Sequence, residues 1–515
     1  MALAFGALHS WRAGAPGFTW DESVTVIASR MPPPDLAKMC FGYHDAVHFF
    51  YYAFIRLWAG AFGRGEMALR APSALAVAVA VYFTVLIGRR LKNTAVGVGA
   101  GLALGFLPAV AAHALDARPF ALAMAAAAGW TWALVRPARR WWVYTLWGLG
   151  AVSLSFYTAM LLVPHALWLV AGGLAGGLAA GDPARPVERR RFGRAAAPVA
   201  GVAVALAGLA LGQRSQVRWL AKFGVNVEDQ LVSPYFAADG RSALIAWGSI
   251  VVGLLVIAVR AIARRGRAAP APGAAQDRAG GAAEGHTGGR LRGLRLRLRL
   301  PGPLLVAGWL VLPQTAVVLA HTLVTPSFAP RYLLFAAPAL ALALAWTARS
   351  ALANAGLALV TAAMVASGLT GWLALRDGAG AGAAFNGDEY GPVARHLADA
   401  AAPGDTILFT GEGWNGPAKG AAAYRDLYRP FTDATLLATA EAIGRFEDAR
   451  RTVGEALDAD RPDRLWFVYW PDRPGLAAEQ EALRLADLCP SSTWSAGRTR
   501  IDQYTACRPD RGPVP

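Results

Sequence analysis

The sequence has few acidic residues for its length and few charged residues of any kind. Of 515 residues, 34 are Asp or Glu; charged residues make up 16% of the chain and hydrophobic residues 55%. This composition is too apolar for an ordinary soluble protein of this size, so we exclude that class. Apolar runs of about 20 residues recur along most of the chain, long enough for a helix to cross a hydrocarbon core of about 30 Å. The sequence therefore predicts a mainly α-helical, polytopic transmembrane bundle.

Cysteines and nucleotide-binding motifs are also scarce. The three cysteines, Cys40, Cys489 and Cys507, form no CxxC pair, which argues against a zinc ribbon. The stretch "GVGAGLALG" (97–105) does not fit a dinucleotide-binding pattern, and its small residues inside an apolar run are typical of close helix packing. In "GEGWNGPAKG" (411–420), Pro417 stands where a phosphate loop needs lysine. A cytoplasmic enzyme that uses a nucleotide sugar is therefore not indicated.

The net charge of +16 is unevenly distributed. Residues 376–515 hold 21 acidic and 16 basic residues, a net charge of −5, whereas the preceding residues hold 13 acidic and 34 basic residues, a net charge of +21. Positive charge in the loops of a membrane domain indicates topology and contact with anionic membrane lipids. We therefore predict no binding of nucleic acid.

Ten apolar runs are long enough to be spans. The short apolar stretch "MALAFGALH" before them is expected to be the remnant of a further first span, which would make eleven. The ten predicted spans are 71–88, 94–113, 119–135, 141–157, 159–178, 195–212, 243–260, 303–321, 332–348 and 355–375.

The loops between these spans fall into two classes. One class is dense in arginine and is predicted to be cytoplasmic; it comprises 89–92, 136–140, 182–194 and the long basic loop 260–302. The other class, which includes the first outer loop 11–70, is then extracytoplasmic. Nine of the 13 acids before residue 376 lie on this outer face, which favours a site there: Asp21, Glu22, Asp35, Asp45, Glu66, Asp116, Glu228, Asp229 and Asp239.

Two domains are predicted, a transmembrane catalytic domain (1–375) and a small extracytoplasmic α/β domain (376–515). In the second, helices are expected in 389–401, 441–457 and 475–488, a turn followed by a buried strand in 403–411, and further strands in 463–470 and 500–507. Outside the cytoplasm, a disulfide between Cys489 and Cys507 is expected, with Cys40 left unpaired. Residues 266–290 are of low complexity and predicted to be disordered.

Three polar clusters on the outer face are candidate functional residues, and each has a structural alternative. Asp21 and Glu22 open a short helix, which a capping role would also explain. Asp116 and Arg118 end one span, where they would alternatively form a structural pair or cap. Arg331, beside Tyr332, is either a snorkelling anchor or a guanidinium that grips a lipid phosphate. The loop 11–70 adds Asp45 and His48.

Five stretches occur in an order that resembles the GT-C glycosyltransferases. They are "WDESVT", "DAVHFFYY", "ALRAPSALA", "DARPFAL" and "RYLLFAAPAL", and the resemblance covers roughly residues 15–375. It is strongest to the family 39 and mannosyltransferase-like members, which are related to protein O-mannosyltransferases and the lipid A aminoarabinose transferase. The pattern departs from the family at Asp116, where a glutamate is frequent, and at "HFF", where prolines follow the histidine.

The resemblance implies a polyprenyl-phosphate sugar donor and an acceptor hydroxyl on the outer face. Asp21 maps onto the catalytic acid, with Glu22 beside it, and a carboxylate base would deprotonate the acceptor. Arg118 and Arg331, with Tyr332, would bind the donor phosphate and stabilise the charge that develops on it. Glu22 and Asp45 would shape acceptor binding or a metal site. Some relatives hold a divalent metal ion in this region, so Asp45, His48 and Asp116 are candidates either for contact with the acceptor or for ligands of such an ion.

We therefore expect an inverting, mannosyltransferase-like hexosyltransferase of a bacterial plasma membrane. Its sugar is mannose or another hexose or pentose, and its acceptor is a lipid, a polysaccharide or a protein. The alternatives are a transporter or flippase of lipid-linked glycans, and an inactive membrane scaffold. A transporter should carry charges at mid-membrane and show two related halves, and the sequence has neither pattern.

Overall fold

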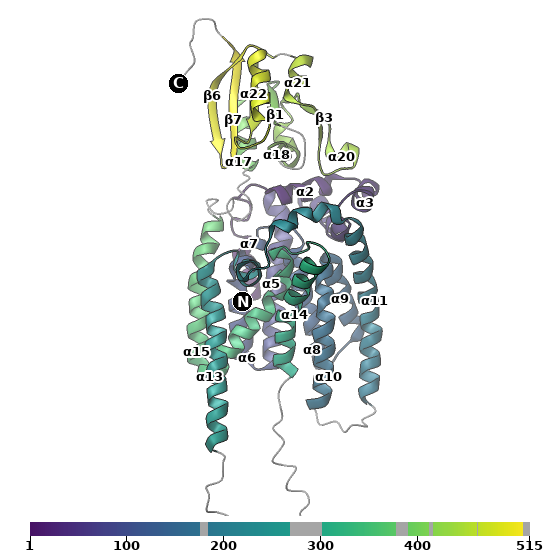
Figure 1. Cartoon of the computed structure of the whole chain (residues 1–515), viewed down its shortest axis with the longest axis vertical. Helices are drawn as coiled ribbons and strands as arrows, with labels where there is room; N and C mark the ends of the chain where they lie inside the picture. Colours follow the sequence, from purple (N-terminus) through teal and green to yellow (C-terminus); the bar gives the residue numbers. More distant parts are fainter. Residues whose placement is uncertain (176–183, 268–300, 377–389, 411–415, 461, 508–515) are drawn as a thin grey trace, which may run out of the picture.

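The computed structural model describes residues 1–175, 184–267, 301–376, 390–410, 416–460 and 462–507. It consists of a helical bundle with a smaller α/β domain at one end (Figure 1). All but the first two residues of the predicted disordered stretch 266–290, and most of the predicted basic loop 260–302, lie outside the described residues. The main helices of the bundle are α1 (Ala2–Ser10), α5 (Glu66–Leu91), α6 (Thr94–Gly105), α7 (Pro108–His113), α8 (Phe120–Val135), α9 (Trp141–Leu154), α10 (Leu162–Ala175), α11 (Ala184–Gly212), α13 (Gly240–Arg267), α14 (Pro301–Leu323) and α15 (Ala337–Arg376).

Within the described part of the chain, five helical segments are long and apolar enough to cross a membrane. They are 66–91, 187–212, 240–260, 301–323 and 330–376, and three shorter apolar helices accompany them. Each predicted span overlaps one or more of the observed helices. The fold class predicted from the sequence, a mainly α transmembrane bundle with a small α/β domain, is confirmed.

Breaks in the helices occur at two places in the predicted spans, one inside a span and one between two spans. The span 94–113 is divided into α6 and α7, because Pro108 starts a new helix and disfavours helical backbone at Leu107, which is extended (φ −61°, ψ 127°). The long helix α15 contains a break at Leu352 and Ala353, where Ala353 has a positive φ of 58°. This break separates the predicted spans 332–348 and 355–375.

The first outer loop folds into helices between the bundle and the C-terminal domain (Figure 1). The ends of the bundle that carry the arginine-rich loops point away from that domain, as the C-terminal end of α13 shows (Figure 1). The helices of the outer loop are α2 (Trp20–Arg30), α3 (Pro33–Gly42), η1 (Ala46–His48) and α4 (Phe49–Phe62). The remaining short helices of the bundle are η2 (Phe156–Leu161), η3 (Arg214–Lys222), η4 (Glu228–Val232), α12 (Ser233–Phe236) and η5 (Pro330–Ala336).

The C-terminal domain is a mixed sheet with helices. Its five-stranded sheet has the order β2-β1-β5-β7-β6, in which β2, β1 and β5 are parallel and β7 and β6 are antiparallel to their neighbours. The strands are β1 (Thr406–Phe409), β2 (Thr432–Asp433), β3 (Leu436–Ala438), β4 (Ala449–Arg450), β5 (Arg464–Tyr469), β6 (Leu488–Ala496) and β7 (Thr499–Ala506). The helices are α17 (Tyr390–Ala400), α18 (Ala418–Ala423), α19 (Arg425–Tyr428), α20 (Ala440–Ile443), α21 (Val453–Ala459) and α22 (Leu476–Leu485).

One predicted element of this domain is wrong. The helix expected over 441–457 is instead α20, strand β4 and α21. Gly444 ends α20 in the left-handed conformation (φ 63°), and a capping box between Thr452 and Glu455 starts α21. The expected disulfide Cys489–Cys507 is present and joins β6 to the end of β7, and Cys40 is free and buried.

The hydrophobic core of the outer loop is continuous with that of the C-terminal domain. Phe18, Val26 and Tyr52 pack in one cluster with Tyr390, Phe446 and other residues of the second domain. Polar contacts support the same interface: the hydroxyl of Tyr424 accepts a hydrogen bond from the backbone N–H of Phe18 (2.7 Å) and donates one to Glu66 (2.8 Å). The outer loop is therefore covered by residues from the far end of the chain.

Candidate active site

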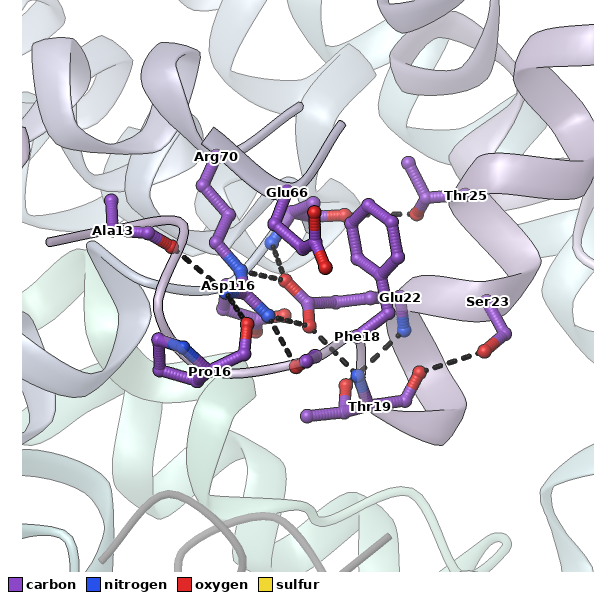
Figure 2. Close-up of polar contacts among 12 residues, drawn as sticks. Ala13, Pro16, Phe18, Thr19, Glu22, Ser23, Thr25, Glu66, Arg70 and Asp116 are labelled. Carbon is purple, nitrogen blue, oxygen red and sulfur yellow. Dashed lines mark hydrogen bonds and ion pairs between the residues drawn. The ribbon is translucent and has the colours of Figure 1, made fainter. Parts of the chain in front are cut away.

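Glu22 lies at the centre of a buried polar network. Its carboxylate accepts hydrogen bonds from Nε and Nη2 of Arg70 (2.7 and 2.6 Å) and from the backbone N–H of Ala117 (2.8 Å) (Figure 2). It also accepts one from the backbone N–H of Thr19 (2.9 Å) and so completes the capping box that starts α2. The remaining donors of Arg70 bind the carbonyl oxygens of Ala13, Pro16 and Gly17.

This network gives Glu22 a structural position. Its side chain is fully buried, and its four hydrogen bonds occupy both carboxylate oxygens. A buried ion pair that is saturated in this way fixes the loop before α2 against the start of α5. We therefore propose a structural role for Glu22 in place of the catalytic role expected from the sequence.

Asp21, its neighbour, has a different environment. Its side chain is 20% exposed and forms an ion pair with Nη1 of Arg331, which is 310 residues away in the sequence. Burial alone would raise the pKa of Asp21, but the positive charges of Arg331 and Arg118 outweigh it and hold the pKa below its usual value. Asp21 is therefore an ionised carboxylate beside two guanidinium groups. Thr19, and not Asp21, caps α2, so the alternative capping role does not apply to Asp21.

Aromatic rings surround Arg331. Its guanidinium carbon lies 5.6 Å from the ring centroid of Phe120, 5.4 Å from that of Trp219 and 6.0 Å from that of Tyr332. The buried Nε of Arg331 has no hydrogen-bond partner among the described residues. Tyr332 stacks on Tyr157 with 5.1 Å between ring centroids. The guanidinium of Arg331 is thus surrounded by aromatic rings, including that of Tyr332, and its Nε–H has no partner among the described residues.

Arg118 is connected to the other candidate residues through Tyr52. Nη1 of Arg118 donates a hydrogen bond to the hydroxyl of Tyr52 (3.0 Å), and this hydroxyl donates to Oδ2 of Asp45 (2.6 Å). The other carboxylate oxygen of Asp45 lies 2.5 Å from Nδ1 of His48. The buried Nε of Arg118 also has no partner within the described ranges. The structure therefore places two guanidinium groups near Asp21, each with an unpartnered donor.

The turn at Asp45 is held by residues that the sequence analysis did not single out. Asp45 has a positive φ of 74°, which is uncommon for a residue other than glycine. Gln216 accepts a hydrogen bond from the backbone N–H of Asp45 (3.1 Å), and Gln213 accepts one from that of Ala46 (3.0 Å). These contacts cross 171 and 167 residues of sequence. No local motif around either glutamine indicates the contact.

Asp116 belongs to a separate part of the network. Its carboxylate contacts Nδ1 of His113 (3.1 Å), and its backbone carbonyl accepts a hydrogen bond from Ser73 (2.7 Å). The structural pair between Asp116 and Arg118 that the sequence offered as an alternative is not observed as a hydrogen bond, because Arg118 bonds to Tyr52 instead. Burial raises the pKa of Asp116, although its contact with His113 lowers it in part.

The candidate metal ligands do not converge. Asp45 and His48 contact each other, whereas Asp116 contacts His113. Among the residues that the structure describes, no three His, Cys, Asp or Glu side chains lie close enough to hold a metal ion together. The described residues therefore do not fit the metal site that the sequence offered as one alternative, and we route no chemical step through a metal.

Comparisons with known proteins identify the fold. No protein-family model matches the chain, and no curated protein matches it. Among solved structures, ArnT from Cupriavidus metallidurans in the apo state aligns with a TM-score of 0.50 at 12% identity, covering 95% of this chain and 93% of ArnT. ArnT bound to undecaprenyl phosphate aligns with a TM-score of 0.47 at 13% identity, covering 90% of this chain and 88% of ArnT. At this identity the likeness shows the fold alone: the chain has a fold similar to that of ArnT over nearly its whole length.

Proposed function

We propose that this protein is an integral-membrane glycosyltransferase that moves a sugar from a polyprenyl-phosphate donor to an acceptor hydroxyl outside the cytoplasm. One observation carries the proposal: an ionised carboxylate, Asp21, lies beside two arginines that each have an unpartnered, buried donor. A sugar transfer of this kind needs both a base for the acceptor and cations for a phosphate leaving group.

Arg331 and Arg118 are the proposed phosphate ligands. A guanidinium presents several N–H donors in a planar fork, which suits bidentate contact with phosphate oxygens. The Nε atoms of both arginines have hydrogen-bonding capacity left for such oxygens. The rings of Phe120, Trp219 and Tyr332 around Arg331 would exclude water and strengthen this electrostatic contact.

Asp21 is the proposed base. The acceptor oxygen attacks the anomeric carbon of the donor sugar as the bond from that carbon to the phosphate oxygen breaks. Asp21 takes the proton from the acceptor hydroxyl, and the electron pair of the broken bond stays on the polyprenyl phosphate. Because this is a single displacement, the configuration at the anomeric carbon inverts. The phosphate gains one negative charge, which Arg118 and Arg331 would stabilise.

Donor binding and activation of the base are coupled in this arrangement. Arg331 is shared, since it pairs with Asp21 and is also a proposed ligand of the phosphate. When a phosphate binds some of the N–H donors of Arg331, the positive charge of the guanidinium is partly neutralised. The pKa of Asp21 then rises, because Arg331 stabilises its ionised form less. Asp21 would therefore become a better proton acceptor when the donor is bound.

The donor and acceptor classes follow from this chemistry. We propose that the donor carries mannose or another hexose or pentose, and that the acceptor is a lipid, a polysaccharide or a protein. We also propose that the protein lies in a bacterial plasma membrane with Asp21 and the C-terminal domain outside the cytoplasm. The arginine content of the opposite loops and the disulfide Cys489–Cys507 support this orientation.

The decisive experiment compares the wild type with Asp21→Asn. Membranes that contain each protein are supplied with radiolabelled polyprenyl-phosphate sugar and tested for release of the sugar onto acceptors. We expect Asp21→Asn to lower turnover roughly 100-fold or more, because the base is lost, while the protein still inserts. Full turnover by Asp21→Asn would refute the assignment of the base. Movement of the intact donor across the membrane without sugar transfer would instead identify a transporter or flippase.

The matched control is the adjacent acid, Glu22→Gln. This substitution removes the negative charge of Glu22 and leaves the buried guanidinium of Arg70 without its ion-pair partner, which should cost about 3–5 kcal/mol of stability. We therefore expect a lower melting temperature and less inserted protein, but nearly normal turnover per folded molecule. A folded Glu22→Gln protein with the catalytic defect of Asp21→Asn would show that the two acids act together.

A further inference from the structure

The C-terminal domain brings one cationic side chain down to the candidate active site. Lys419 lies on α18, which packs against α2 (Figure 1), and its side chain is buried. Its ammonium nitrogen lies 5.6 Å from the ring centroid of Trp20, the residue before Asp21. It donates a hydrogen bond to the backbone carbonyl of Phe446 (2.6 Å).

Two further contacts fix this arrangement. Arg30, at the other end of α2, donates hydrogen bonds to the carbonyls of Ala422 (2.6 Å) and Ala423 (3.1 Å) at the end of α18. The two helices are thus held together near both of their ends. The ring of Phe446 packs against Tyr52, with 5.9 Å between the centroids, and Tyr52 bonds both Asp45 and Arg118.

We infer that Lys419 is a positioning residue of the active site, which holds the loop at Phe446 against Tyr52 and so orients the hydroxyl that links Asp45 to Arg118. This inference rests on the proposed function and extends it, because it makes the C-terminal domain a part of the site. Lys419 acts on the reaction through position. Its charge-assisted hydrogen bond to the carbonyl of Phe446 holds the loop that packs on Tyr52, and loss of the charge would weaken this hydrogen bond.

The charge on Lys419 should depend on pH near pH 8, a range in which sugar transfer can be measured. Burial lowers its pKa to about 8, and the carboxylates of Glu447, Asp448 and Asp21 oppose this effect in part. The ammonium form is therefore present below pH 8 and is lost as the pH rises through that value. Wild-type sugar transfer should decline over the same interval.

The test measures the pH dependence of sugar transfer by the full-length protein in membranes. We expect Lys419→Met to reduce transfer about 10-fold at pH 7 and to lose the decline near pH 8, because its side chain does not titrate. Lys419→Arg keeps the charge at all these pH values, so it should retain most transfer at pH 7 and also lack the decline. The control, Arg484→Met, removes an exposed cation from the same domain and should behave as the wild type.

Each outcome is informative. A Lys419→Met protein with the wild-type rate and the same decline would overturn the inference and leave the proposed function intact. If Lys419→Met does not accumulate, Lys419→Arg decides: loss of the decline supports the inference, and its retention overturns it. If the wild type transfers no sugar, the proposed function fails, and the shift in melting temperature on adding undecaprenyl phosphate at pH 7 is measured instead. A smaller shift for Lys419→Met than for Arg484→Met supports the inference, and equal shifts overturn it.

Discussion

Asp21 and Glu22 are adjacent in the chain and chemically alike, yet their partners give them separate roles. Glu22 points into the protein and is fully occupied by Arg70 and two backbone N–H groups. Asp21 shares its main partner, Arg331, with the proposed phosphate. A helix turns its successive residues by about 100°, so two neighbours necessarily face different surroundings.

Replacement of Arg331 by Met should change the pH dependence of sugar transfer, because Arg331 is the main partner of Asp21. Asp21 has a lowered pKa, so its ionised form persists as the pH falls below the usual range of an aspartate. Without Arg331, burial dominates, the pKa of Asp21 rises, and the acid limb of transfer moves to higher pH. We also expect kcat to fall roughly 100-fold or more through loss of a phosphate ligand. An unchanged acid limb in measured rates from pH 4 to pH 7 would contradict the role of Arg331 beside Asp21.

The sequence was sufficient to group Asp21, Arg118 and Arg331, because a recognisable order of motifs ties them to one face. It was not sufficient to separate Glu22 from Asp21, since burial and partners decide that difference. Gln213, Gln216 and Lys419 were not foreseen at all. Each acts across more than 25 residues of sequence, and none lies in a motif that carries a chemical signature.

At the scale of helices, hydrophobic runs predicted where the elements are and one of the two breaks. The break at Leu352 and Ala353 falls between the predicted spans 332–348 and 355–375, whereas the break at Leu107 lies inside a single predicted span, although Pro108 marks it. Strand β6 was missed because most of its side chains are exposed and polar, so it lacks the alternation of a half-buried strand. Backbone pairing with β7, and not a hydrophobic pattern of its own, holds β6 in the sheet.

The small residues of "GVGAGLALG" do serve helix packing, as predicted. A Cβ added at Gly97 would lie 2.5 Å from the carbonyl oxygen of Val85 and 2.9 Å from the backbone nitrogen of Arg89, so α5 and α6 would have to separate. We expect Gly97→Ala to destabilise the bundle by about 1–3 kcal/mol. Gly150→Ala is the control, since no atom lies within 4 Å of its added Cβ. Thermal unfolding measured in detergent should show a lower melting temperature than the wild type for Gly97→Ala and an unchanged one for Gly150→Ala.

At the scale of the whole molecule, the disulfide should stabilise the C-terminal domain without taking part in transfer. It closes a segment with a sequence separation of 18 at the edge of the sheet, away from α18 and α2. We expect the double variant Cys489→Ser/Cys507→Ser to lose about 2–4 kcal/mol of stability in that domain. A reductant should lower the melting temperature of the wild type and leave that of the double variant unchanged. Equal responses of the two proteins to the reductant would contradict this prediction.

The core that joins the outer loop to the C-terminal domain has a consequence for biogenesis. The ribosome makes Phe18 early and Tyr424 more than 400 residues later, yet each is a packing partner of the other. Until the last quarter of the chain has been made, α2 packs against α4 but lacks the cover that α18 and α20 provide. A nascent or truncated chain would therefore display this part of α2 to chaperones and proteases. Completion of the protein thus changes the surface that the first helices present, because part of their cover is made last.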